Sequence, residues 1–299
     1  MREEAVLFGE KKSLVGILTD PNAGRSDVGD VALILLNAGI LHRVGPGRIY
    51  VNIARELAAR GFTTFRFDFS GIGDSRPRPD NLPFDKSSID ETQSAMDILE
   101  TKRGIRSFIL MGGCSGARVS FNTSCVDSRV SGSILINCPV TADDDVDLKP
   151  EANKRKNAHY YLNFAIRNSQ SWRNFFTGEV NYRKIFGALA FSLRRRFGPE
   201  EAVTSSEWLV FRQNLNAVIK RGVRPVFVCS EGDSGLQELR EAGGHEFIDL
   251  CSRGETELVV IPRSDHTFSS LFDQERLIKI LREKTVEIAR RAPLLAPAS

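Results

Sequence analysis

The 299-residue sequence has no apolar run long enough to cross a membrane or to form a secretory signal. A membrane span needs roughly 20 apolar residues, and the opening MREEAVLFGEKKSLVGILTD is charged from its second residue. A P-loop, a dinucleotide glycine fingerprint and internal repeats are also absent. We therefore expect a cytoplasmic protein with no membrane span.

Cysteine is scarce and follows no metal-binding pattern. The five residues form no CxxC pair and show no zinc-like spacing, and an odd number in a reducing compartment does not suggest disulfides. We expect neither a metal nor a cofactor. Four of the five lie in or beside apolar stretches and are predicted to behave as small core residues, whereas Cys114 lies among glycines.

The formal net charge is only +3, but the positive charge is concentrated in one segment. Residues 149–196 contain eleven Lys and Arg against Glu151 and Glu179, a net +9 that leaves about −6 for the remainder. The surrounding segment 140–205 is rich in aromatic residues and has no clear strand. A basic helical cap is the interpretation we favour over a nucleic-acid-binding segment, because nothing resembles a nucleic-acid motif.

Strand-like and helix-like patterns alternate outside this segment. The stretches EEAVLF and SLVGILT predict an antiparallel pair at a sheet edge, joined by the charged turn Gly9–Lys12. Further strands are predicted at 31–37, 62–69, 108–111, 130–137, 224–230 and 257–262. Helices are predicted between them, one with a Ser88–Glu91 capping box that runs to about Thr101.

The alternation predicts an α/β fold, with a mostly parallel eight-strand-type sheet and helices on both faces. Its core would comprise residues 1–139 and 206–290. A basic helical cap insertion would occupy 140–205, and a flexible tail 291–299.

The stretch SFILMGGCSGARVS (107–120) predicts a strand, a sharp turn and a helix. This is the pattern of a nucleophile elbow, where bulk two residues to either side of the nucleophile would clash. Cysteine stands at Cys114, between Gly112 and Gly116, in the place usually held by serine. Ser115 also has small neighbours two residues away, but the frame centred on Cys114 supplies the small pair Gly-Ala for close approach of the helix, and we favour Cys114.

Two further polar residues follow predicted strands, Asp233 in CSEGDSG and His266 in PRSDHTF. The carboxyl ends of parallel strands meet at one edge of a sheet, so Cys114, Asp233 and His266 are predicted to form a triad in the order nucleophile, acid, histidine. His266 would accept the thiol proton, and the resulting ion pair would lower the pKa of Cys114. Asp233 would hold the tautomer of the histidine.

The oxyanion is predicted to bind two backbone N–H groups. One is that of Ser115, at the start of a helix, and only its backbone is expected to be needed. The other is that of Ala38 or Gly39, in the loop after strand 31–37. His42 and Arg43 lie near this loop and could line a pocket, and a surface role fits them equally well.

The sequence resembles the α/β-hydrolase superfamily over nearly its whole length, through its NAG loop, RFDFSGIGDS, the elbow, EGD and SDHTF. The stretch LLNAGILHRVGPGRIYVNIARELAARGFTTFRFDFSGIGDS and the phrase SWRNFFTGEVNYRKIF are more closely similar to cysteine-elbow hydrolases of exosortase and polyketide-type gene clusters. Dienelactone hydrolases have the same GxCxG elbow. The resemblance implies an enzyme that acts on acyl esters or thioesters.

A cysteine nucleophile gives an acyl-thioester intermediate, which suits acyl transfer or thioester cleavage as well as ester hydrolysis. An acidic acyl-carrier protein is a candidate partner for the basic cap, through the triple arginine Arg194, Arg195 and Arg196. The alternative is a catalytically idle scaffold that binds an acidic partner through this cap.

Overall fold

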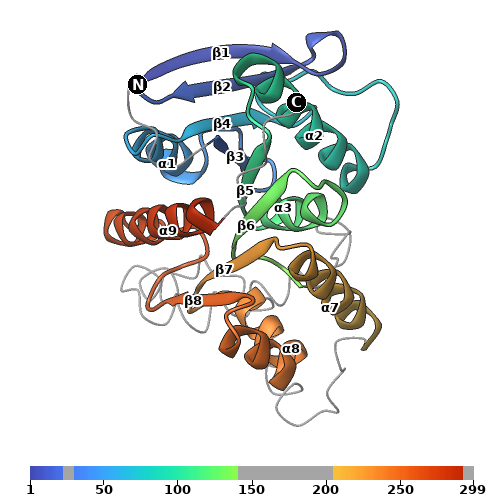
Figure 1. The fold of residues 1–299 in the computed structure, drawn as a ribbon, viewed down its shortest axis with the longest axis vertical. Helices are drawn as coiled ribbons and strands as arrows, with labels where there is room; N and C mark the ends of the chain where they lie inside the picture. The colour runs from blue at the N-terminus through green and yellow to red at the C-terminus, as the bar shows by residue number, and fades with distance from the viewer. Residues whose placement is uncertain (23–29, 141–204, 292–299) are drawn as a thin grey trace, which may run out of the picture. The chain divides into compact units, whose positions relative to one another are not determined.

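The computed structural model describes residues 1–22, 30–140 and 205–291. In these ranges eight strands form one sheet in the order β1-β2-β4-β3-β5-β6-β7-β8 (Figure 1). The strands are β1 (Arg2–Phe8), β2 (Leu14–Asp20), β3 (Val31–Leu36), β4 (Thr63–Asp68), β5 (Ser107–Gly113), β6 (Val130–Ile136), β7 (Arg224–Ser230) and β8 (Glu257–Ile261). The helices are α1 (Ile49–Ala58), α2 (Phe84–Arg103), α3 (Ser115–Val126), α7 (Ser205–Lys220), α8 (Ser234–Ser252) and α9 (Leu271–Arg291).

The sheet is mostly parallel. Strand β2 pairs antiparallel with both β1 and β4, whereas the five pairings from β4 through β3 to β8 are parallel. The predicted antiparallel edge pair and mainly parallel sheet are therefore confirmed. This topology brings the carboxyl ends of β3, β4, β5, β6, β7 and β8 to the same edge.

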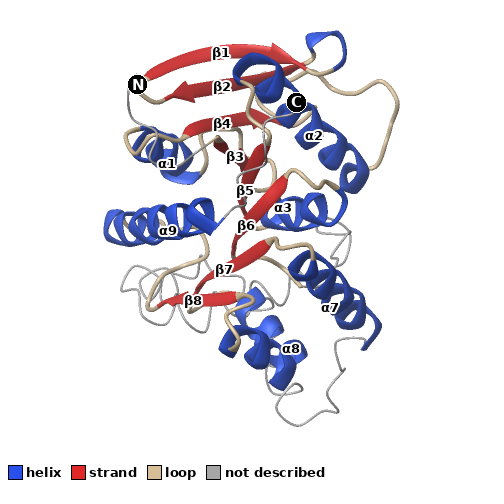
Figure 2. Ribbon diagram, in the orientation of Figure 1, coloured by secondary structure: helices blue, strands red, loops and turns tan. Residues whose placement is uncertain are grey.

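Helices cover both faces of the sheet because the central strands are apolar on both sides. All six residues of β3 are buried. Ile34 and Leu36 pack into a core with residues of α2, α3, α7 and α8, whereas Leu33 and Leu35 pack into a second core with α1 and α9. Figure 2 shows the two groups of helices on opposite sides of the strands.

Helix α2 differs from its prediction, because it begins at Phe84 rather than after Ser88. Ser88 thus lies inside the helix, where its hydroxyl donates to the carbonyl of Asp85. The buried Glu91 side chain accepts from the Ser70 N–H at 2.9 Å. The predicted capping box is wrong, since Glu91 instead holds the turn that follows β4.

The predicted cap at 140–205, including Arg194, Arg195 and Arg196, lies outside the described residues except at its two ends. The predicted tail at 291–299 lies outside them except for its first residue. The division into core, cap and tail therefore stays a prediction. Among the helices that are described, none combines the length and apolar character that crossing a membrane requires.

Candidate active site

Cys114 lies in the sharp turn between β5 and α3. Its backbone has φ 53° and ψ −119°, a left-handed region that side-chain-bearing residues rarely adopt. A Cβ added to Gly112 would lie 2.4 Å from the carbonyl carbon of Gly116, and one added to Gly116 would lie 2.4 Å from the carbonyl oxygen of Asn37. Positions two residues before and after Cys114 therefore admit only glycine, which is the geometry of an elbow centred on Cys114.

An elbow centred on Ser115 would not require glycine two residues before it. Ser115 is the first residue of α3, and Gly113, two residues before it, has no atom nearer than 3.5 Å to an added Cβ. The close packing of backbone at the turn therefore singles out Cys114 and not Ser115.

His266 and Asp233 meet at the same edge of the sheet. The Nδ1 atom of His266 lies 2.5 Å from Oδ2 of Asp233. The other carboxylate oxygen of Asp233 accepts from the N–H of Gly235 at 2.9 Å, so Asp233 also caps the first turn of α8. These two bonds fix the carboxylate against the imidazole, and the Asp233 side chain is only 4% exposed.

The imidazole also interacts with Cys114. The hydrogen bond that the imidazole donates to Asp233 raises the pKa of His266 to about 10, and a hydrogen bond with the Cys114 side chain is the second cause. Both partners favour the imidazolium, which is the form that a neighbouring thiolate would stabilise. The structure thus brings together the three side chains that the sequence predicted to meet.

The four remaining cysteines lie in or against the core, as predicted. Cys138 and Cys229 are buried, and Cys125 and Cys251 are half-buried against the core. Burial raises the pKa of each thiol, to about 11 for Cys125 and about 12 for Cys229. All five cysteines are free thiols.

The loop after β3 lies beside the elbow. The N–H of Gly39 donates to the hydroxyl oxygen of Ser115 at 2.8 Å, and the carbonyl of Ala38 closes a turn by accepting from the N–H of Leu41. The residues predicted to form the oxyanion site, Ser115, Ala38 and Gly39, are therefore neighbours in space. The bond between Gly39 and the Ser115 side chain was not predicted.

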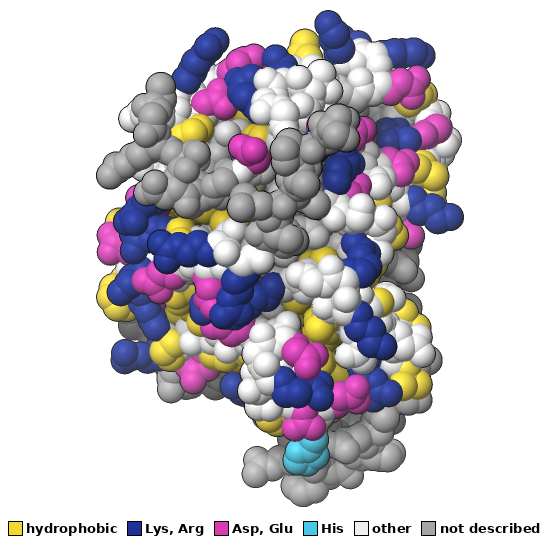
Figure 3. Space-filling view, in the orientation of Figure 1, with side chains coloured by type: hydrophobic (Ala, Val, Ile, Leu, Met, Phe, Trp, Pro, Cys, Tyr) yellow, Lys and Arg dark blue, Asp and Glu magenta, His cyan; other side chains and the backbone are white. Residues whose placement is uncertain are grey.

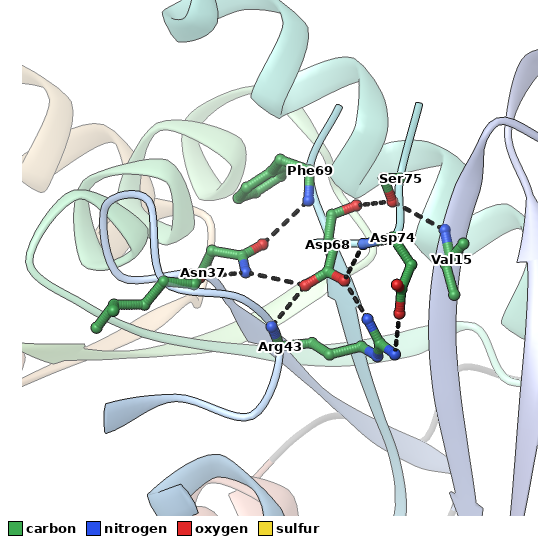
Figure 4. Close-up of polar contacts among 8 residues, drawn as sticks. Val15, Asn37, Arg43, Asp68, Phe69, Asp74 and Ser75 are labelled. Carbon is green, nitrogen blue, oxygen red and sulfur yellow. Dashed lines mark hydrogen bonds and ion pairs between the residues drawn. The ribbon is translucent and has the colours of Figure 1, made fainter. Parts of the chain in front are cut away.

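Asp68, at the end of β4, anchors this loop (Figure 4). Its carboxylate is fully buried, pairs with the Arg43 guanidinium and accepts from the Arg43 N–H at 2.5 Å. It also accepts from the Asn37 amide, which donates in addition to the carbonyl of Leu41. Both ends of the stretch 37–43 are thus tied to one buried carboxylate.

The glycine turn after β4 completes the anchor. Gly73 has φ +54°, and a Cβ there would lie 2.3 Å from the Asp68 carboxylate, so only glycine lets the chain pass. The N–H of Asp74 then donates to Asp68 at 3.2 Å, and the Asp74 carboxylate bonds Arg43 at 2.6 Å. The Arg43 guanidinium therefore binds protein carboxylates. His42, for which a pocket role and a surface role were both open, is exposed.

The sequence matches the profile described as "Alpha/beta hydrolase family" over residues 33–279, which is most of the chain. The chain belongs to the alpha/beta hydrolase family. Comparison with curated proteins gives no match.

Solved structures similar to this alpha/beta hydrolase share its fold. A proline iminopeptidase from Mycobacterium smegmatis superposes with a TM-score of 0.57 at 16% identity, covering 97% of this chain and 100% of that one. The Pyrococcus furiosus esterase Pf2001 gives 0.56 at 12%, covering 97% and 93%. An alpha-beta serine hydrolase homologue from Coxiella burnetii gives 0.54 at 14%, covering 95% and 98%. Such low identities establish the fold alone.

Two residues that position the candidate site of this alpha/beta hydrolase were missed in the sequence. Asn137, at the end of β6, donates to the carbonyl of His266 at 2.8 Å and accepts from the N–H of Ser230 at 2.8 Å. The buried hydroxyl of Tyr50 accepts from the N–H of Gly113 at 2.9 Å. Asn137 follows a strand, so the strand-end rule could have found it, whereas Tyr50 lies within α1 and carries no such signal.

Proposed function

We propose that this alpha/beta hydrolase transfers or hydrolyses acyl groups through a thioester formed on Cys114. The observation that carries the proposal is the placement of Cys114 at an elbow closed by Gly112 and Gly116, with His266 between it and Asp233. Membership of the family supports a hydrolase. The cysteine makes the intermediate a thioester rather than an oxygen ester.

The chemistry follows from the charges at the site. His266 takes the thiol proton, and the Cys114 sulfur forms a bond to the acyl carbon while the carbonyl π pair moves to oxygen. The carbonyl then re-forms, the bond to the leaving group breaks, and the imidazolium returns the proton to that group. Asp233 fixes the ring through Nδ1 and stabilises its cationic form.

The intermediate can pass its acyl group to water, to an amine or to another thiol. Exchange between two thioesters is nearly neutral in free energy, so a thiol acceptor or donor suits this enzyme well. The resemblance of the stretch from LLNAG to GIGDS and of the phrase SWRNFFTGEVNYRKIF to cysteine-elbow hydrolases of exosortase and polyketide-type gene clusters supports a role in biosynthesis, on acyl groups bound to a carrier protein.

The uneven distribution of charge along the sequence supports such a carrier protein as the partner. Residues 149–196 carry +9, whereas the rest of the chain carries about −6. On the face drawn in Figure 3, basic and acidic side chains of the described residues are mixed. We infer that the acidic carrier protein meets residues 149–196, whose field would speed encounter and orient the thioester arm.

A catalytically idle scaffold is the competing function. A scaffold has no need of a buried carboxylate held against an imidazole that also contacts a cysteine. The presence of all three groups in one place favours an enzyme.

The test is turnover of a panel of acyl thioesters and oxygen esters by the wild type, Cys114→Ala and a control, Cys125→Ser. Cys125 lies on α3, and its sulfur bonds the carbonyl of Phe121, a bond that serine retains. We expect turnover by the wild type and the control and none by Cys114→Ala. Full turnover by Cys114→Ala would refute the proposal, and so would inactivity of the wild type toward every ester and thioester tested.

A further inference from the structure

The side chain of Ser115 lies between the two backbone segments that were predicted to bind the oxyanion. Its hydroxyl oxygen is 2.8 Å from the nitrogen of Gly39, which donates to it. The second oxyanion donor was expected to be the N–H of Ala38 or that of Gly39, and the Ser115 oxygen takes the bond from Gly39. A backbone-only oxyanion site, with Gly39 donating directly, does not describe this arrangement.

The Ser115 hydroxyl has a proton to give. Because its oxygen accepts from Gly39, the O–H bond is polarised and becomes a better donor than an isolated hydroxyl. Among the described residues no acceptor for this proton is found. The N–H of Ser115 itself, at the start of α3, also has no acceptor there.

We propose that the Ser115 hydroxyl is itself an oxyanion donor, held in place by the Gly39 N–H. This inference rests on the proposed acyl chemistry of Cys114. When the sulfur attacks, the carbonyl π pair moves to oxygen, and the Ser115 N–H and O–H both hydrogen-bond that oxygen. Ser115 keeps its proton throughout, and the leaving group is protonated by His266.

The anchored loop supports this role. Electrostatic stabilisation is effective when donors are fixed before the reaction, and Gly39 belongs to the stretch that Asp68 ties down at both ends. The hydroxyl is thereby held by a rigid backbone donor rather than by a mobile side chain. Ser115 is thus a catalytic residue through its side chain as well as its backbone.

The experiment compares two reactions of Cys114 in the wild type, Ser115→Ala and Ser115→Thr. Acylation by a small acyl thioester develops an oxyanion, whereas alkylation by iodoacetamide occurs at a saturated carbon and develops none. Rates of both are measured over pH, and mass spectrometry locates the acyl group. The matched control is Ser124→Ala, which removes a buried hydroxyl of the same helix that bonds the carbonyl of Ser120.

We expect Ser115→Ala to acylate Cys114 about 10²-fold more slowly, the loss typical of one oxyanion donor. Alkylation should stay within about twofold at every pH, and Ser115→Thr, which keeps a hydroxyl, should recover most of the acylation rate. Ser124→Ala should match the wild type in both reactions.

Unchanged acylation in Ser115→Ala would overturn the inference, because the hydroxyl would then bond Gly39 without contributing to acylation. An equal loss of acylation and alkylation would also overturn it, since Ser115 would then shape the elbow. If the wild type carries its acyl group on Ser115 or takes none, the proposed function of Cys114 fails instead.

Discussion

Replacing Gly116 by alanine should destabilise the protein, although alanine is the better helix former. Gly116 is the second residue of α3, where the gain in helix propensity is at most about 1 kcal/mol. The new Cβ would lie 2.4 Å from the carbonyl oxygen of Asn37 and 2.6 Å from that of Leu36. Both contacts are with backbone, so the end of β3 or the start of α3 must move.

The size of the effect follows from these contacts. Real Cβ atoms essentially never approach within 3.0 Å, so a movement of at least 0.6 Å, from 2.4 to 3.0 Å, is required. Overpacking of this kind costs about 1–3 kcal/mol. We expect Gly116→Ala to lower the free energy of unfolding by that amount, and to slow alkylation of Cys114, because the movement displaces the elbow and the adjoining loop.

Gly113→Ala is the matched control. Its Cβ would meet nothing nearer than 3.5 Å, so the loss of unfolded-state freedom should stabilise the protein by about 0.4–1 kcal/mol. Urea unfolding measures both, with the midpoint shifting at an unchanged m-value. If Gly113→Ala proves as destabilising as Gly116→Ala, or Gly116→Ala is as stable as the wild type, the elbow is not centred on Cys114.

Three further outcomes are expected. His266→Ala should move the pH midpoint of Cys114 alkylation up toward the ordinary thiol value of about 8.5. The reason is that Cys114 raises the pKa of His266, so the His266 imidazolium in turn favours the Cys114 thiolate. An unchanged pH profile would remove His266 from the site. Asp68→Ala should lower the free energy of unfolding, measured in urea, by about 3 kcal/mol. This is the low end for breaking a buried ion pair, because Arg43 still pairs with Asp74. The control Asp80→Ala breaks an exposed ion pair and should cost far less than Asp68→Ala, and equal losses for the two would argue against the anchor. Reversing the charge of Arg194–Arg196 should slow turnover of a carrier-bound acyl group, most at low salt, and leave turnover of a small thioester unchanged. An equal loss of turnover on both substrates would count against the carrier.

Most of the fold could be predicted because its strands are short apolar runs with clear ends. The run VALILLN predicts a strand at 31–37, and β3 covers 31–36. The start of α2 could not be read in this way. Ser88 and Glu91 have the spacing of a capping box, but Glu91 bonds Ser70, which the sequence gives no means of foreseeing.

In the candidate site, too, the residues at strand ends could be predicted and the contacts between loops could not. Cys114, Asp233 and His266 each follow a strand, so topology alone predicts that they meet. The side-chain bond between Ser115 and Gly39 joins residues 76 positions apart, and that between Asn137 and His266 joins residues 129 apart. Such contacts depend on how loops pack at the sheet edge, for which the sequence has no local pattern.

The most direct test of the account is to find where the acyl group is bound. The protein is mixed with an acyl thioester, quenched within the first turnover and digested, and the modified peptide is sequenced by mass spectrometry. The account predicts one acyl group on Cys114, sensitive to hydroxylamine and absent from Cys114→Ala. An acyl group on Ser115, or an adduct that persists in Cys114→Ala, would contradict it.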